Sequence, residues 1–375
     1  MVCLTMQRYE NLYYTLSPIF VPRMKLSQRI ESLHWLGEEI RTFLDKQEYK
    51  EWNHALKLAE QQNGWFTRDN IIMALKGFEP WLTRDALQQW ANTYHLPEEN
   101  NKPITVSVVM AGNIPLVGFH DFLCVLITGN IIEAKLSSSD NILLSFLAKR
   151  LIEIEPLWKG FIKIVEKLSP ALQAVIATGS NNTAKHFEYY FKSVPHIIRR
   201  NRNGVAVLNG KETEQELSEL GKDIFSYFGL GCRNVSKLYV PDGYDFSTFF
   251  RSIEKYGDVI QHNKYANNYA YNRTIYLMDS KVFTDNNFLA VIENKQISSP
   301  IAVLHFEYYK DLSNLGKELT EHTEQIQCIA ANKEVAKKLG SASIPIVEFG
   351  HTQSPGLTDY ADGVDVIKFI LEQNR

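Results

Sequence analysis

The sequence has few cysteines, and they form no pairing pattern. Its 375 residues include four of them: Cys3, Cys124, Cys232 and Cys328. They are widely spaced and contain no CxxC pair, whereas a disulfide framework or a structural zinc site needs closer, regular spacing. His305, His322 and His351 show no metal-ligand spacing either, so we expect no metal. Free thiols are typical of a reducing compartment, and we expect a cytoplasmic protein.

Long apolar runs and an excess of charge are also missing. The longest apolar candidate, residues 119–132, is interrupted by His120, Asp121 and Asn130, whereas a membrane span needs about 20 apolar residues. The formal net charge of −3 gives no support for a nucleic-acid partner held by bulk charge. Residues 1–23 mix polar and aromatic side chains, unlike a signal peptide. We interpret them as a disordered or misassigned extension.

The first 103 residues predict a layer of helices. Apolar side chains recur at three- and four-residue spacing from Leu26 to about Lys57, which is the stripe of an amphipathic helix. Thr67 and Thr83 are good N-caps for two further helices. A connector rich in Pro and Asn, residues 96–103, ends this layer.

After the connector, short β runs alternate with helices. Predicted strands of a first unit cover residues 105–110, 130–135, 174–178, 196–199 and 204–208. Those of a second unit cover residues 235–240, 274–278, 301–306, 326–330 and 344–349. Such alternation predicts parallel, doubly wound sheets with a ligand crevice at the carboxyl ends of the strands. We therefore predict an α/β protein with two doubly wound domains, residues 104–228 and 229–350, and a C-terminal segment, residues 351–375. The active site is expected at the seam between the domains.

A stretch around Cys232 joins a helix to a strand and carries the candidate nucleophile. Gly229 and Gly231 precede the cysteine, and glycine allows positive φ and close approach of the backbone to a ligand. Arg233 follows at once, and Lys237 lies on the next strand. Positive neighbours favour the thiolate, which is the nucleophilic form of cysteine. The alternative is a tight turn around a buried thiol, but we predict covalent chemistry at Cys232.

Five blocks of sequence follow one another between residues 104 and 371. They are MAGNIP (110–115) with KLSSSD (135–140), TGS (178–180), GLGCRNVS (229–236), HNKYANNYAYNR (262–273) and DYADGVD (359–365). In this order and spacing they resemble the aldehyde dehydrogenase superfamily. More narrowly, they resemble its acyl-CoA reductase branch, typified by the bioluminescence long-chain fatty acid reductase. The resemblance implies an aldehyde-dehydrogenase-like fold whose two domains enclose a covalent active site.

The resemblance also implies roles for individual residues. Cys232 matches the nucleophile, and the Asn113 amide, with the Cys232 backbone N–H, matches the oxyanion hole. Lys135 matches a lysine that contacts the adenosine ribose and the 2′-phosphate of NADPH. Gly179 and Ser180 match the turn over the pyrophosphate at a helix N-terminus. On residue type alone, Lys135 could be a solvated strand end and Ser180 an ordinary helix cap.

One carboxylate is missing where aldehyde-oxidising relatives carry the general base. Residues 193–210 contain neither Asp nor Glu, and Gln296 stands near the position of the usual cofactor-ribose glutamate. Without a base to activate water, a thioester on Cys232 would persist until a thiol or a hydride resolves it. We therefore predict an NADPH-dependent acyl-CoA reductase that takes an acyl-CoA or acyl carrier protein thioester and releases an aldehyde. The alternatives are a Cys-dependent acyltransferase or thioesterase without nicotinamide chemistry, and a non-catalytic protein that retains the fold.

The sequence does not decide the roles of several further residues. The cluster Arg199–Arg202 is either an exposed basic face or an anion site for cofactor or CoA phosphates. His262 and Lys264 are candidates for general acid–base work. Cys124 and Cys328 lie in apolar runs and are expected to pack in the core. The residues do not decide the acyl chain length, the choice of NADPH over NADH, or the oligomeric state, for which a homodimer is the default.

Overall fold

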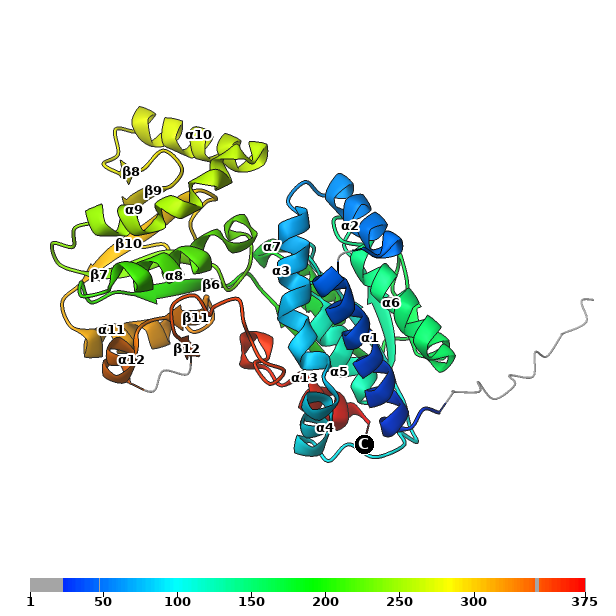
Figure 1. The fold of residues 1–375 in the computed structure, drawn as a ribbon. Coiled ribbons are helices and arrows are strands. Elements are labelled where there is room, and N and C mark those ends of the chain that lie inside the picture. Colours follow the sequence, from blue (N-terminus) through cyan, green and yellow to red (C-terminus); the bar gives the residue numbers. More distant parts are fainter. Residues whose placement is uncertain (1–22, 47, 341–343, 375) are drawn as a thin grey trace, which may run out of the picture.

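Two β-sheets, each carrying helices on its faces, organise the chain (Figure 1). The computed structural model describes residues 23–46, 48–340 and 344–374. The first sheet is parallel, with the strand order β3-β2-β1-β4-β5. Its strands are Thr105–Val109 (β1), Ile131–Lys135 (β2), Ile162–Ile164 (β3), Ala174–Thr178 (β4) and His196–Arg199 (β5). The connecting helices are Phe119–Ile127 (α5), Leu143–Ile154 (α6), the 3-10 turn Pro156–Gly160 (η2) and Asn181–Phe191 (α7).

The N-terminal helices pack on this first unit, as the apolar stripe predicts. They are Leu26–Lys46 (α1), Lys50–Gln62 (α2), Arg68–Phe78 (α3), the 3-10 turn Glu79–Leu82 (η1) and Arg84–Thr93 (α4). The predicted caps are confirmed, since the Thr67 and Thr83 side chains accept hydrogen bonds from the first-turn N–H groups of Asn70 and Ala86. The stripe expected to reach Lys57 is divided between α1 and α2.

Burial explains why the sheet and these helices form one core. β1 and β4 are buried over residues 106–108 and 174–177, as a parallel sheet covered by helices requires. α5 contacts both α1 and β2, and its Phe122 and Cys124 are fully buried. The prediction that Cys124 is a core residue is confirmed. Among the helices of the described residues, none combines the length and the apolarity needed to cross a membrane.

The second sheet has the order β12-β11-β6-β7-β10-β9-β8 and is parallel except where β8 meets β9. Its strands are Asn203–Val207 (β6), Val235–Pro241 (β7), Thr284–Asp285 (β8), Ala290–Glu293 (β9), Val303–Tyr309 (β10), Ile326–Ala330 (β11) and Ile346–Val347 (β12). Its helices are Glu214–Phe225 (α8), Ser226–Gly229 (η3, 3-10), Ser247–Ile253 (α9), Glu254–Gln261 (η4, 3-10), Asn263–Met278 (α10), Leu312–Glu321 (α11) and Lys333–Leu339 (α12). Cys328 is fully buried on β11, as predicted.

Strand pairing corrects the predicted division of the chain. The sequence pattern places β6 in a first domain that ends at residue 228. In the structure β6 pairs instead with β7 and β11 of the second sheet. The chain therefore passes from one sheet to the other between Arg199 and Asn203. The partner of a strand depends on residues far away in sequence, which a linear pattern does not reveal.

The expected strand at residues 274–278 is also wrong, because these residues form the last turns of α10. Their composition, TIYLM, favours a strand. The helix that begins at the His262 N-cap continues through them, and only Tyr276 of this run is buried. Leu277 and Met278 remain exposed. The preceding helix, rather than local propensity, decides the conformation.

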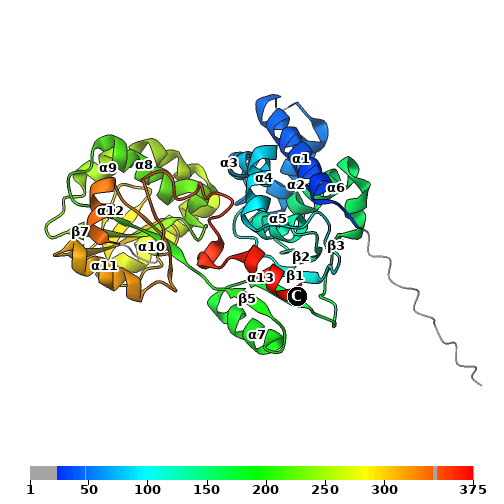
Figure 2. The same cartoon turned by 90° about the horizontal axis from the view of Figure 1, so that it is seen from below.

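The chain ends in the first unit. Residues 350–365, which we name the strap, lead from the second unit back to the first through the 3-10 turn Ala361–Gly363 (η5). Helix Val366–Gln373 (α13) follows and buries Val366, Ile367 and Ile370 against the first core. In Figure 2 the strap and α13, in red, lie between the two units. The segment predicted to be separate from both domains thus crosses from the second unit to the first, and its helix belongs to the first core.

Candidate active site

Cys232 lies in the loop between α8 and β7, at the seam between the two units. The backbone just before it is left-handed at Tyr227, Phe228 and Gly229, with φ of 51°, 57° and 80°. Such a conformation costs a non-glycine residue roughly 1–2 kcal/mol. The Asn234 side chain holds this loop, because its Oδ1 accepts from the Gly231 N–H at 2.8 Å. Its Nδ2 donates to the carbonyls of Asp223 and Ser226 at 2.9 and 2.8 Å.

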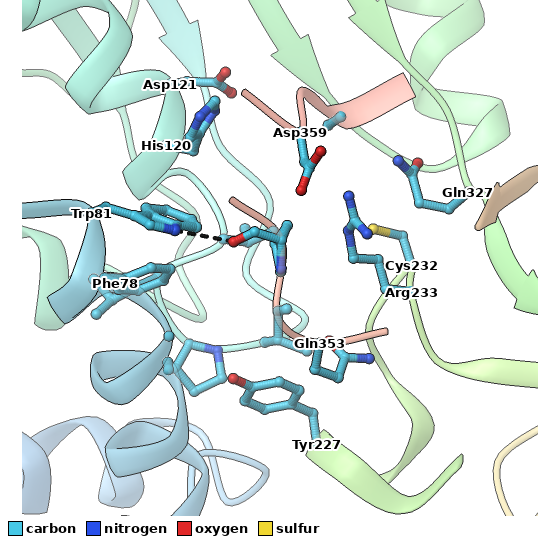
Figure 3. A pocket seen from close by; sticks show the side chains of 18 of the residues that line it. Phe78, Trp81, His120, Asp121, Tyr227, Cys232, Arg233, Gln327, Gln353 and Asp359 are labelled. Atoms are coloured by element: carbon cyan, nitrogen blue, oxygen red, sulfur yellow. Dashed lines mark hydrogen bonds between the residues drawn. The ribbon is translucent and has the colours of Figure 1, made fainter. Parts of the chain in front are cut away.

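A pocket of about 150 Å³ opens beside Cys232, between the two units (Figure 3). One wall is apolar and consists of Ala74, Gly77, Phe78, Trp81 and residues 114–117. The other is more polar and contains Arg199, Arg233, Gln327, Gln353 and Asp359. Figure 3 shows Phe78 and Trp81 on the side of the pocket opposite Cys232 and Arg233. This pocket places the Cys232 thiol next to an apolar surface.

Asn113 reaches the loop that carries Cys232. It follows β1, is exposed, and its Nδ2 donates to the Leu230 carbonyl at 2.7 Å. The structure thus brings together two predicted catalytic residues that are far apart in sequence. The turn after Asn113 is held by the Asp140 carboxylate, which accepts from the Leu116 N–H at 2.7 Å. Leu116 has a φ of 60°, so this contact fixes an otherwise unfavourable backbone.

Asp140 makes the stability of this turn depend on pH. Burial raises the pKa of Asp140 from 3.8 to about 7, and the Leu116 N–H opposes that rise. Between these two values the unfolded carboxyl is ionised while the folded one keeps its proton. The free energy of unfolding therefore falls as the pH rises, by roughly 4 kcal/mol once the pH exceeds 7.

We expect Asp140→Asn to abolish this pH dependence. Asparagine keeps an oxygen acceptor for the Leu116 N–H and carries no charge. The melting temperature of the wild type relative to the variant should fall from about pH 4 to about pH 7 and then level off. Differential scanning calorimetry at half-unit pH steps measures this difference. A difference that does not change with pH would contradict the assignment to Asp140.

The three residues predicted to bind the cofactor lie along one edge of the first sheet. Lys135 ends β2, and Gly179 follows β4, so they flank the end of β1. Ser180 caps α7, its Oγ accepting from the Thr183 N–H at 3.2 Å. A Cβ at Gly179 would lie 3.0 Å from Thr183, so the backbone passes close to the first turn of α7. A helix N-terminus next to a strand end and a cation suits a dinucleotide phosphate. Lys135, Gly179 and Ser180 are therefore suitably arranged to bind a nicotinamide dinucleotide, and their roles stay predictions.

The electrostatics of Cys232 differ from the expectation. Burial raises the pKa of the Cys232 thiol, and the positive charges of Arg233 and Arg199 only oppose that rise. Lys237 lies on β7, but its Nζ is bonded to Glu307 at 2.6 Å and to the Lys295 carbonyl at 2.8 Å. Of the two cations near Cys232 in sequence, only Arg233 therefore acts on the thiol, which is protonated near neutral pH.

We expect the alkylation rate of Cys232 to depend on two opposing effects on its thiol pKa, burial and the charge of Arg233. Iodoacetamide should label it with a rate that still increases above pH 9, since burial raises the thiol pKa. At pH 8, Arg233→Gln should slow the labelling several-fold, because it removes a charge that lowers the pKa, whereas Arg233→Lys should not. Peptide mass spectrometry separates Cys232 from Cys124 and Cys328. Equal rates in Arg233→Gln and the wild type would contradict the proposed influence of Arg233.

The basic cluster forms neither an exposed face nor an open anion site. Arg199 is buried and forms a two-bond ion pair with Asp121 of α5. Arg202 contacts Asp362 at 3.1 Å and donates to the Thr323 carbonyl at 2.6 Å. Arg200 is the exposed member and pairs with Glu188.

His262 and Lys264, the other two residues whose roles the sequence leaves undecided, connect the two units. His262 caps α10, its Nε2 donates to the Gly64 carbonyl at 2.8 Å, and its ring stacks on Trp65 and Phe228. The Lys264 ammonium lies over the Trp65 ring. Neither residue lines the pocket that contains Cys232. Their contacts fix the N-terminal helices against the Cys232 loop.

Sequence reasoning missed the pocket residues that come from the strap and from α5. The strap is tied to the second unit by Asp223, which accepts from the Gly350 N–H and from Thr352. It is tied to the first unit by the Trp81 Nε1, which donates to the Pro355 carbonyl at 3.0 Å. Its Asp359 lines the pocket. The DYADGVD block, which begins with Asp359, was the only sequence signal for this part of the pocket. The block alone does not indicate that Asp359 lies beside Cys232.

A comparison of the sequence with known protein families gives one match. The family model described as acyl-CoA reductase (LuxC) matches residues 27–253, more than half of the chain. A search of curated proteins gave no match.

Solved structures show the same fold. Aldehyde dehydrogenase 21 from Physcomitrella patens, in complex with succinate, has a TM-score of 0.67 at 13% identity, covering 93% of this chain and 84% of its own. HpcC from Thermus thermophilus has a TM-score of 0.64 at 15% identity, and the match covers 87% of this chain and 74% of HpcC. The NAD+ complex of a Bacillus cereus aldehyde dehydrogenase has a TM-score of 0.61 at 13% identity, and the match covers 87% of this chain and 77% of that enzyme. At these identities the likeness shows the fold alone, and it confirms the predicted two-domain, aldehyde-dehydrogenase-like α/β architecture.

Proposed function

Because this chain belongs to the acyl-CoA reductase (LuxC) family, we propose that it forms an acyl thioester on Cys232 and reduces it with NADPH to an aldehyde. The observation that carries the proposal is the contact between Asn113 and the Cys232 loop, at the head of a partly apolar pocket. A nucleophile, an oxyanion donor and an apolar surface are what transfer of an acyl group requires.

The first step is an exchange of thioesters. The Cys232 Sγ attacks the carbonyl carbon of acyl-CoA or of an acyl carrier protein thioester. The new S–C bond forms, the C–S bond to the donor breaks, and the leaving thiolate takes the proton of the Cys232 thiol. The second amide hydrogen of Asn113 and the Cys232 backbone N–H are the donors that would hold the oxyanion. The Arg233 charge increases the fraction of Cys232 that is thiolate.

The pocket supports a long-lived thioester. Two carboxylates line it, Asp121 and Asp359. Both carboxylate oxygens of Asp121 accept hydrogen bonds from the terminal nitrogens of Arg199. Asp359 accepts from the Gly356 N–H at 2.7 Å within the strap. Since neither stands where relatives carry the hydrolytic glutamate, we infer that water attacks the thioester slowly.

The residues at the edge of the first sheet would hold the cofactor. Bound NADPH would supply a hydride to the thioester. Lys135 is placed to meet a ribose or a 2′-phosphate, and the first turn of α7 after Gly179 and Ser180 is placed to meet a pyrophosphate. These residues bind and orient; the reacting carbon is presented by Cys232.

The proposal is tested by following acyl-CoA-dependent loss of NADPH absorbance together with the product. The expected product is an aldehyde in a 1:1 ratio to NADPH consumed, with CoA released. Free fatty acid without NADPH consumption would indicate a thioesterase, and acyl transfer to an added thiol alone would indicate an acyltransferase. The absence of any covalent acyl-protein would indicate a non-catalytic protein.

A further inference from the structure

The apolar wall of the pocket has a gap in helix α3. Ala74 and Gly77 lie three residues apart, so they occupy the same face of the helix, and both line the pocket. The large rings of Phe78 and Trp81 follow them along the same wall. At Ala74 and Gly77 the wall therefore lacks the bulk that Phe78 and Trp81 give it elsewhere on the helix side.

Nothing in the backbone requires a glycine at position 77. It lies within α3, and its φ is not positive. A Cβ built there would meet nothing within 4 Å, whereas one at Gly37 would lie 2.6 Å from the Leu82 Cβ. A glycine inside a helix is roughly 0.5–1 kcal/mol less stable than alanine. Gly77 therefore lowers the stability of α3 for a reason that neither a turn nor close packing explains. Its effect on the pocket is to leave open space at the wall.

The rings around this gap are fixed in place. The Trp81 Nε1 donates to the Pro355 carbonyl of the strap at 3.0 Å. Phe78 packs on Trp81 and Phe119, with centroid distances of 5.1 and 4.9 Å. Because these rings are held, they cannot easily move to admit a ligand, and the unfilled space at Gly77 is the place where one can extend.

We propose that Gly77, with Ala74, determines the length of the acyl chain that Cys232 carries. The inference rests on the function proposed above and deepens it. A cavity of about 150 Å³ is the size that accommodates benzene in an engineered protein, which corresponds to about six carbons. An aliphatic chain bound to Cys232 leaves the polar wall and follows the wall of α3. Beyond about six carbons, it passes through the gap at Gly77.

The test is a series of acyl-CoA thioesters from acetyl to palmitoyl, without nicotinamide. Acylation of Cys232 is followed by intact-protein mass spectrometry in the wild type, Gly77→Ala, Gly77→Phe and the control Lys76→Phe. Lys76 is exposed on the same turn and lies outside the pocket. In Gly77→Phe, the ratio of the palmitoyl-CoA to the acetyl-CoA acylation rate should fall about 10- to 100-fold relative to the wild type. Gly77→Ala should shift the profile less in the same direction, and Lys76→Phe should match the wild type.

The two proposals fail in different ways. If no acyl-CoA labels Cys232 in the wild type, the proposed function is wrong and this inference falls with it. If the wild type is labelled and Gly77→Phe keeps the same length profile, only the inference about Gly77 is wrong. Should Gly77→Phe not fold, Gly77→Ala decides, because its methyl group enters open space. An unchanged profile in Gly77→Ala would then overturn the inference.

Discussion

Cys232→Ser is expected to lose aldehyde formation by roughly four or more orders of magnitude, the scale seen when other covalent enzymes lose their nucleophile. Serine nearly preserves the size of the side chain but is far less acidic. The positive charges that favour an ionised side chain here, Arg233 in the same loop and Arg199 at the end of β5, are too few to make up for that difference. The wild type, given radiolabelled acyl-CoA without nicotinamide, should accumulate close to one label per chain. Neutral hydroxylamine should release this label, as it does for thioesters.

Cys328, a buried cysteine close to Cys232, provides a control for this assignment. Cys328 lies on β11, and its Sγ is 3.9 Å from the Arg233 carbonyl, so this thiol lies next to the Cys232 loop. Burial raises its pKa to about 12. We expect Cys328→Ala to keep full labelling while Cys232→Ser loses it. Hydroxylamine-sensitive label that persists in Cys232→Ser would place the acyl group elsewhere.

The predictable part of the fold rests on signals that are local. The Thr67 and Thr83 caps and the apolar stripe of α1 are visible in sequence because each depends on a few neighbouring residues. The strand at residues 174–178 is predicted with its observed limits for the same reason. Sheet membership is different. β6 comes just after β5 in sequence and still pairs with β7 and β11, a choice made by packing over long separations.

The same division applies to the site. Cys232 and Asn113 can be named from motifs, and the structure brings their loops into contact. The direction of the Cys232 pKa shift could not be predicted, because Arg233 is visible in sequence and burial is not. The ion pair between Arg199 and Asp121 joins β5 to α5, and nothing in either segment indicates the other. Pocket walls are made by such contacts, so they appear only in three dimensions.

Asn113→Ala is expected to slow acylation of Cys232 by about 10²- to 10³-fold, as the loss of one oxyanion donor does elsewhere. Asn113 also holds the loop through the Leu230 carbonyl, so a second readout must separate the two roles. Iodoacetamide alkylation of Cys232 forms no oxyanion and reports only on the thiol and its position. If Asn113 binds the oxyanion, acylation falls by the full factor while alkylation changes by less than about three-fold. Equal losses in both reactions would show that Asn113 only positions the loop, and the oxyanion would then depend on the Cys232 N–H.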